Sequence, residues 1–339
     1  MKILILTGLL LSVGLVSFAQ LDITAERQKA RNFMQSGDLD NAVLVLTKAR
    51  DVDKNNMEVQ KDLSLAYYYK KDYAKALETI KPVIANPDCD PAAYQLAGNI
   101  YKAQENYKEA EKNYKEGLKD FPKSGPLYND YGELLDILKN PAGAIALWQK
   151  GMQVAPSYGA NYYNAAAYYF KQPEDKVWAI VYGEIYANME SLNPKANIMK
   201  KVVLDAYKQK LFLSSDLAAE AEKEKNPFAK AVILTFAKQS GISAQGITPE
   251  SLAMIRTRFV LDWNAAYAKQ FPFKLFDYHQ QLMKDGLFDS YNAWMFGPVA
   301  DQKAFESWAN AHKEEYDKFT EYHTSRIFKM PAGQVYSAK

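Results

Sequence analysis

The three histidines are the residues whose type could bind a metal or transfer a proton. His279, His312 and His323 all lie in the C-terminal third of the chain. On one helix, His312 and His323 would be about 16 Å apart along the axis, and zinc–nitrogen bonds are about 2 Å long, so the two cannot share an ion. His312 with Glu315 would need further ligands from elsewhere, and a histidine on an aromatic helix face is more often a packed core residue. We therefore predict no metal site and no catalytic residue. Carboxylates near these histidines in sequence are Asp277, Asp301 and Glu315.

Other signatures of chemistry are absent from the sequence. It contains no HExxH, GxSxG, Walker-type loop, dinucleotide glycine fingerprint or CxxC. Cys89 is the single cysteine, so no disulfide can form within the chain. The 42 Lys and Arg residues nearly balance the 40 Asp and Glu residues, whereas nucleic-acid binding requires a strongly basic face. We predict no cofactor and no nucleic-acid partner.

The elements that would position the histidines are predicted to be aromatic helices of a C-terminal region, residues 195–339. Apolar residues at helical spacing predict a helix from about 195 and a helical pair over 216–239. Residues 240–251 are the best linker candidate, and Thr248, Pro249 and Glu250 read as the start of a long helix that ends near Phe271. One final helix is expected over 301–327. Its predicted aromatic face consists of Phe305, Trp308, His312, Tyr316, Phe319 and His323.

Upstream of this region the chain repeats itself. Ala42, Ala76, Ala110 and Ala144 are separated by 34 residues at each step. With this alanine as position 20, position 8 is always small and positions 11 and 24 are mostly large. Small residues let two antiparallel helices approach closely, and large residues fill the seams between them. The residues at positions 8, 11 and 24 are Ala30, Ser64, Gly98 and Gly132; Phe33, Tyr67, Tyr101 and Leu135; and Leu46, Ile80, Tyr114 and Trp148.

This pattern resembles the tetratricopeptide repeat family, whose period is 34 residues. The resemblance covers residues 23–158 as four regular repeats, with an irregular fifth over 159–194. In the fifth repeat Trp178 falls at the alanine position, where Ala179 could substitute if the turn is one residue longer. The resemblance implies an all-α fold, in which a helix–turn–helix solenoid (20–194) precedes the C-terminal module. That module is predicted to cap the solenoid, and it is similar to C-terminal regions of exported Bacteroidota repeat proteins.

The family resemblance also implies a binding surface. In this family the first helix of each repeat lines a concave groove, with positions 5, 9 and 12 facing inward. The groove would run from basic residues, through amides and acids, to aromatic residues. A solvated helix face without a ligand is the alternative interpretation. The predicted groove residues are Arg27, Arg31, Lys61, Tyr68, Gln95, Asn99, Lys102, Asn129, Glu133, Asp136, Tyr163 and Phe170.

The first residues predict the cellular location of the protein. Residues 1–19 have a basic start, an apolar run and small residues before Ala19, as a secretory signal peptide does. A membrane anchor needs about 20 apolar residues, so we expect cleavage, after Ala19 or Gln20, and no membrane insertion. The Ala-Gln junction resembles signal cleavage sites of Bacteroidota. We expect an exported, periplasmic protein, with an extracellular location as the alternative.

These observations predict a non-catalytic scaffold of the cell envelope that binds a protein or peptide in its repeat groove. Aromatic and amide side chains suit the recognition of extended peptides. Two alternatives remain open: an enzyme in the aromatic C-terminal module, and a glycan binder that uses Trp178, Tyr163 and Phe170 as stacking platforms.

Overall fold

The computed structural model describes residues 22–213 and 216–338. The predicted signal peptide, 1–19, lies outside the described residues. Nineteen α-helices and one 3-10 helix account for the regular structure of the described part, which confirms the predicted all-α fold. The chain divides into two compact units, with the division between Cys89 and Asp90.

The first unit consists of two helical pairs. The helices are α1 (Ile23–Ser36), α2 (Leu39–Val52), α3 (Met57–Tyr69) and α4 (Tyr73–Ile84). Each helix begins after a side chain that accepts a hydrogen bond from a backbone amide of the first turn, which satisfies a donor that the helix itself cannot. The N-caps are Asp22, Asp38, Asn56 and Asp72. The period-34 alanines Ala42 and Ala76 are both fully buried.

The second unit begins with three more helical pairs, α5 to α10. These are α5 (Pro91–Ala103), α6 (Tyr107–Asp120), α7 (Gly125–Ile137), α8 (Pro141–Val154), α9 (Gly159–Phe170) and α10 (Trp178–Met189). The structure explains the small residues at position 8. A β-carbon on Gly98 would lie 2.3 Å from the Tyr114 ring, and one on Gly132 would lie 2.3 Å from Trp148. The large residue at position 24 therefore lies directly on the small residue at position 8 of the same repeat.

One turn geometry joins the two helices of each regular repeat. The residue at position 15 adopts a left-handed backbone conformation four times, at Gly37 (φ 82°), Lys71 (63°), Glu105 (56°) and Lys139 (59°). Position 15 of the fifth repeat is Pro173, whose ring holds φ near −65° and excludes this conformation. Accordingly α10 begins at Trp178, three residues later than the period from α8 predicts (141 + 34 = 175). The second helix after α9 thus departs from the 34-residue period where a proline stands at the turn position.

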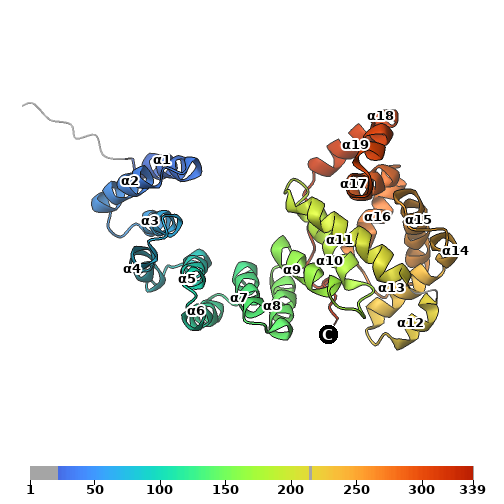
Figure 1. The fold of residues 1–339 in the computed structure, drawn as a ribbon, viewed down its shortest axis with the longest axis horizontal. Coiled ribbons are helices and arrows are strands. Elements are labelled where there is room, and N and C mark those ends of the chain that lie inside the picture. The colour runs from blue at the N-terminus through green and yellow to red at the C-terminus, as the bar shows by residue number, and fades with distance from the viewer. Residues whose placement is uncertain (1–21, 214–215, 339) are drawn as a thin grey trace, which may run out of the picture. The chain divides into compact units, whose positions relative to one another are not determined.

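Ten further elements form the C-terminal part of the second unit. They are α11 (Lys195–Gln209), η1 (Leu211–Leu213), α12 (Leu217–Lys223), α13 (Pro227–Ala237), α14 (Ser240–Ser243), α15 (Pro249–Ala266), α16 (Lys274–Lys284), α17 (Phe288–Ala300), α18 (Gln302–Ala311) and α19 (Lys313–Thr324). The predicted helix start at Thr248 is confirmed, because Thr248 and Ser251 form a reciprocal capping box. Figure 1 shows α10 to α17 gathered into one body, with α18 and α19 at its edge.

Three details of the predicted C-terminal helices are wrong. The linker candidate 240–251 contains the short helix α14, and α15 ends at Ala266 rather than near Phe271. The single helix expected over 301–327 is two helices, because His312 leaves the helical conformation (φ −116°, ψ 35°). The predicted aromatic face is therefore divided. Phe319 and His323 are buried, whereas His312 is exposed and the other three aromatic residues are partly buried.

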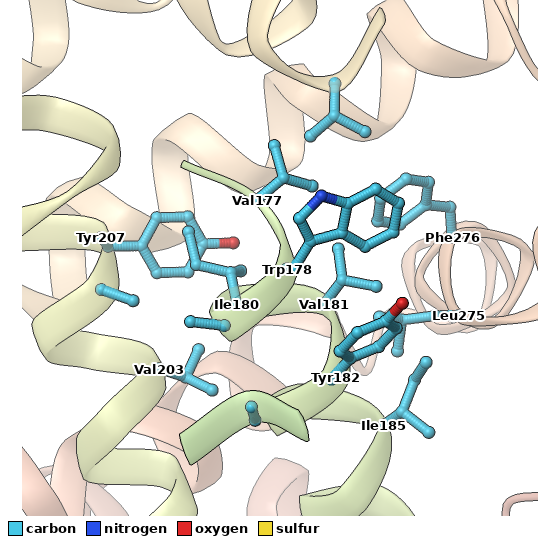
Figure 2. Close-up of a cluster of buried hydrophobic side chains, with 14 of the residues drawn as sticks. Val177, Trp178, Ile180, Val181, Tyr182, Ile185, Val203, Tyr207, Leu275 and Phe276 are labelled. Carbon is cyan, nitrogen blue, oxygen red and sulfur yellow. The ribbon is translucent and has the colours of Figure 1, made fainter. Parts of the chain in front are cut away.

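The core of the second unit surrounds α10. Eleven residues of this helix are buried, so it contacts neighbours on all sides. In Figure 2, α10 side chains extend toward Val203 and Tyr207 of α11 and toward Leu275 and Phe276 of α16. Trp178 retains only 4% exposure and packs against Tyr182 and Phe228. Trp178 therefore cannot stack on a glycan, and that part of the glycan-binding alternative is wrong.

Candidate functional site

A ladder of polar side chains connects the first helices of three successive repeats, α5, α7 and α9. Gln95 Nε2 donates to Asp130 Oδ2 over 2.7 Å, and Asn164 Nδ2 donates to Asn129 Oδ1 over 2.8 Å. In both bonds, position 5 of one repeat meets position 6 of the next. We call Gln95, Asn129, Asp130, Glu133 and Asn164 the amide ladder.

Glu133 lies at the centre of the amide ladder. Its Oε1 accepts from Asn129 Nδ2 over 3.0 Å and from Asn164 Nδ2 over 3.4 Å, and its Oε2 lies 3.5 Å from Lys102 Nζ. The Glu133 side chain remains 43% exposed, so solvent or a ligand can still reach it. Asp130 is only 7% exposed, and burial raises the pKa of its carboxyl group although Gln95 and Asn129 donate hydrogen bonds to it.

The first unit contains the same relation between repeats with charged residues. Arg27 at position 5 donates from Nε to Asp62 Oδ2 at position 6 of the next repeat, over 2.7 Å. Arg31 reaches the other oxygen of Asp62 over 3.1 Å. Glu58 pairs with Arg27 at 2.7 Å and with Lys61 at 2.5 Å. A hydrogen bond from Lys61, aided by Arg27, holds the pKa of Glu58 below its usual value against the effect of burial. The basic character predicted for this end is thus largely neutralised inside the unit.

Sequence reasoning overlooked position 6. Its residues are Gln28, Asp62, Leu96, Asp130 and Asn164. In three of the four repeats that follow another repeat, this residue is an acid or amide that pairs with position 5 of the preceding repeat. Positions 5, 9 and 12 were each read as a column along the chain, whereas this pairing joins two columns across neighbouring helices. The detectable signal was the complementary charge of residues 35 apart, such as Arg27 and Asp62.

Two of the three aromatic residues predicted for the groove, Tyr163 and Phe170, lie at the last repeat. Tyr163 is partly exposed, meets Tyr186 edge-on with ring centroids 5.0 Å apart, and has Lys195 Nζ at 5.6 Å. Phe170, also partly exposed, has Lys210 Nζ at 5.6 Å.

The other predicted residues occupy separate places. Asp136 is exposed near the end of α7. Asn99 accepts a hydrogen bond from the Tyr114 hydroxyl over 3.3 Å. Tyr68 lies in the first unit beside Tyr69 and Tyr73. The twelve predicted residues thus fall into a first-unit group (Arg27, Arg31, Lys61, Tyr68) and a second-unit group (the remaining eight).

A second polar cluster, which sequence reasoning did not find, is buried among the C-terminal helices. Arg256 of α15 pairs with Glu184 of α10 and donates to Asn292 of α17 over 2.6 Å. The Glu184 carboxylate also lies 2.9 Å from His279 Nε2 and accepts from the Tyr291 hydroxyl over 2.7 Å. All five residues are at most 2% exposed. This buried ion cluster joins four helices in the interior.

The histidines do not converge. His279 belongs to the buried ion cluster, and burial lowers its pKa, although Glu184 acts in the opposite direction. His312 is exposed and stacks on Trp308. His323 is buried beside Trp294, and its Nδ1 lies 3.0 Å from the Tyr278 hydroxyl. Within the described residues, no three His, Cys, Asp or Glu side chains form a group that could hold a metal ion. No helix among them has the length and apolar character that crossing a bilayer requires.

Comparison with known proteins supports the repeat assignment. The family model described as tetratricopeptide repeat matches residues 27–88 and 96–160. No curated protein matches the chain. Similar solved structures include pilF of Pseudomonas aeruginosa, with 18% identity over 60% of this chain and 90% of that one, at a TM-score of 0.46. A tetratricopeptide repeat protein of Parabacteroides merdae is 16% identical over 75% of this chain and 96% of its own, at 0.41. A thermophilic protein of this kind from Thermus thermophilus is 15% identical over 55% and 98%, at 0.43.

Proposed function

We propose that this chain, whose residues 27–88 and 96–160 match the tetratricopeptide repeat family model, binds a protein or peptide partner on the first helices of its repeats. The observation that carries the proposal is the amide ladder. Its side chains come from three helices and form one continuous hydrogen-bonded polar strip. Asn129 and Asp130 are buried in it, and Gln95, Glu133 and Asn164 remain partly exposed, so these three can offer donors and acceptors to the main chain of an extended peptide. No catalytic role is proposed.

The chemistry of the second-unit surface defines the peptide further. Glu133 and Asp136 carry exposed carboxylates, and Lys102 is the cation paired with Glu133. Tyr163 and Phe170 provide partly exposed rings at the last repeat. We expect a peptide that bonds the ladder through its backbone, places a basic side chain near Glu133 and Asp136, and places an apolar side chain on the rings. Because the helices are already ordered by their own packing, most of the ordering entropy falls on the peptide.

A library of displayed peptides, selected against the full chain without residues 1–19, tests this proposal. Peptides enriched in basic and apolar residues are expected, with binding measured by fluorescence anisotropy. Combining Glu133→Gln with Asp136→Asn should weaken binding about tenfold, the effect of losing about 1.4 kcal/mol of charge interaction. The matched control is Glu116→Gln, which removes an exposed carboxylate from α6, a second helix of a repeat.

Two results would overturn the proposal. One is that no peptide is enriched over a selection without protein. The other is that the selected peptides bind three proteins equally well: the wild type, Glu133→Gln combined with Asp136→Asn (the ladder variant), and the Glu116→Gln control. The peptide would then lie elsewhere.

We further propose that the protein is exported to the cell envelope, with the periplasm as its location. The support is the basic start, apolar run and small residues of 1–19. Mass spectrometry of the protein from fractionated cells tests it. We expect an N-terminus at Gln20 or Leu21 in the periplasmic fraction, and an intact Met1 in the cytoplasmic fraction would contradict export.

A further inference from the structure

The C-terminal helices form a cleft that the repeat surface does not include. It has a volume of about 620 Å³ and lies among α15, α17 and α18, within the size range of ligand-binding sites. Small side chains of α17, namely Ala293, Gly297 and Ala300, line it at spacings of four and three residues. Lining residues of α17 extend from Asp289 to Ala300, a length of about 16 Å on a helix. The cleft is therefore elongated and can hold a short segment of polypeptide.

The sides of the cleft are apolar and partly open to solvent. Phe305 of α18 leans onto Gly297, where an added β-carbon would lie 2.5 Å from its ring. Trp308, one turn further along α18, is partly exposed and stacks on His312 with ring centroids 4.6 Å apart. Met254 of α15 also lines the cleft, with 54% of its surface exposed. Flexible methionines and flat aromatic rings adapt well to an apolar side chain of a ligand.

Carboxylates surround this apolar interior. Glu250, Asp289 and Asp301 line the cleft, and Lys208 is the one Lys or Arg among the lining residues. Among the described residues, none of these three carboxylates takes part in an ion pair. Each also lies at the start of a helix, where negative charge is favourable, and Asp301 caps α18 through the Ala304 amide. Their place at helix starts explains why carboxylates occur at these positions. Since none of the three is in an ion pair, their negative charge is available at the cleft.

From this charge and shape we propose that the cleft binds a short cationic amphipathic segment of a partner protein. An apolar or aromatic side chain of the segment packs between Trp308 and Met254, and Lys or Arg residues on either side pair with Glu250, Asp289 and Asp301. A basic segment fits because the lining of the cleft contains three carboxylates and only one lysine. This site is separate from the amide ladder and does not depend on the repeat surface being a binding site.

Fluorescein-labelled peptides about ten residues long, which span about 15 Å as a helix, are the probe. The test peptide has a Leu/Phe/Ala centre with lysines at both ends. One control peptide replaces the lysines with glutamate, and another replaces the apolar centre with serine. Binding to the full chain without residues 1–19 is measured by anisotropy at low and high salt. We expect the test peptide to bind at least tenfold more tightly than either control, and added salt to weaken its binding.

Three variants locate the binding. Glu250→Gln combined with Asp289→Asn should weaken the test peptide at least tenfold, and Ala293→Trp should do the same by filling the cleft. Glu314→Gln, which removes an exposed carboxylate from α19, should change nothing. The ladder variant Glu133→Gln with Asp136→Asn should also leave this binding unchanged, which separates the two proposals.

The proposal is overturned if the lysine and glutamate peptides bind equally, or if no peptide binds below millimolar concentration. It is also overturned if Glu250→Gln with Asp289→Asn and Glu314→Gln have the same effect. Loss of binding in the ladder variant alone would place the peptide on the repeats instead.

Discussion

At the scale of residues, charge buried in the second unit is stabilised by specific partners. Burial by itself raises the pKa of Glu184, but Arg256 and His279 outweigh it and hold the pKa at about 2. Glu184 is thus ionised in the folded protein at any pH above this value. A buried charge of this kind is tolerated because Arg256, His279 and Tyr291 all direct hydrogen-bonding groups toward one carboxylate oxygen.

Replacing Glu184 with Gln should destabilise the second unit by about 3–5 kcal/mol, because Arg256 would remain buried without a counter-charge. All five tryptophans lie in the second unit, so urea unfolding followed by tryptophan fluorescence measures it. Glu174→Gln, at an exposed position, is the control. If Glu184→Gln lowers the free energy of unfolding no more than Glu174→Gln does, the buried ion cluster does not stabilise the fold.

Lys200 presents the opposite case, because it is buried and no carboxylate among the described residues pairs with it. It is 3% exposed, donates to the Trp294 carbonyl over 3.0 Å, and lies over the Trp294 ring. Burial lowers its pKa to about 7. Because the unfolded lysine titrates near 10.5, it holds a proton between about pH 7 and pH 10.5 that the folded form has lost. The contribution of Lys200 to stability is therefore expected to rise with pH across this range.

We expect Lys200→Met to remove this part of the pH dependence. Relative to the wild type, the variant should gain about 2 kcal/mol or more at pH 7 and little at pH 10. Urea midpoints at pH 7, 8.5 and 10 measure the difference, with exposed Lys208→Met as the control. Parallel pH profiles of Lys200→Met and the wild type would contradict a lowered pKa.

At the scale of elements, the close contact between the two helices of the third and fourth repeats depends on a glycine, Gly98 or Gly132. Gly132→Ala should destabilise the second unit by about 1–3 kcal/mol, because its β-carbon would overlap Trp148. Gly241→Ala on α14 is the matched control, since nothing lies within 4 Å of its β-carbon. There alanine should be neutral or stabilising through its helix propensity. Equal effects at both positions, measured by urea unfolding, would mean that the Gly132–Trp148 contact relaxes without penalty.

At the turn between the two helices of a repeat, we expect a substitution that stabilises the second unit. Lys139 has φ 59°, a conformation that costs a non-glycine residue about 1–2 kcal/mol. Lys139→Gly should therefore stabilise the second unit by up to about 1 kcal/mol after the entropy of glycine is subtracted. Lys150→Gly, in the exposed interior of α8, should destabilise it by about 1 kcal/mol. Destabilisation by both changes would show that the left-handed turn carries no strain.

At the scale of the whole molecule, the two units have cores of very different size. The core cluster of the first unit comprises eight buried residues, mostly alanine, valine and leucine. That of the second unit extends from Ala144 to Met330 and contains most of the buried aromatic side chains. Because buried apolar area dominates stability, the second unit should be the more stable one.

Circular dichroism detects helices of both units, whereas tryptophan fluorescence reports only the second. We expect the urea transition by circular dichroism to begin at lower urea than the fluorescence transition. Hydrogen exchange should likewise be faster in α1 to α4 than in α10 to α17. Coincident transitions with uniform exchange would mean that the two units unfold as one.

Much of the repeat region could be predicted from sequence, because its contacts lie within one period. The burial of Ala42 and Ala76 and the irregular fifth repeat follow from residue size and from one proline. The pairing of Arg27 with Asp62, and of Gln95 with Asp130, could have been found from complementary polar residues 35 positions apart. The break at His312 could not, because the aromatic pattern continues through it and only packing separates α18 from α19.

The sequence by itself determined the class of fold, the register of the repeats and the absence of a recognisable catalytic motif, because all of these depend on local composition and a fixed period. The tertiary structure alone decided which polar side chains meet among the C-terminal helices. Glu184 and Arg256 are 72 residues apart, and the carboxylates around the C-terminal cleft lie at the starts of α15, α17 and α18. No periodic signal connects such residues, since their proximity results from the packing of whole helices around α10.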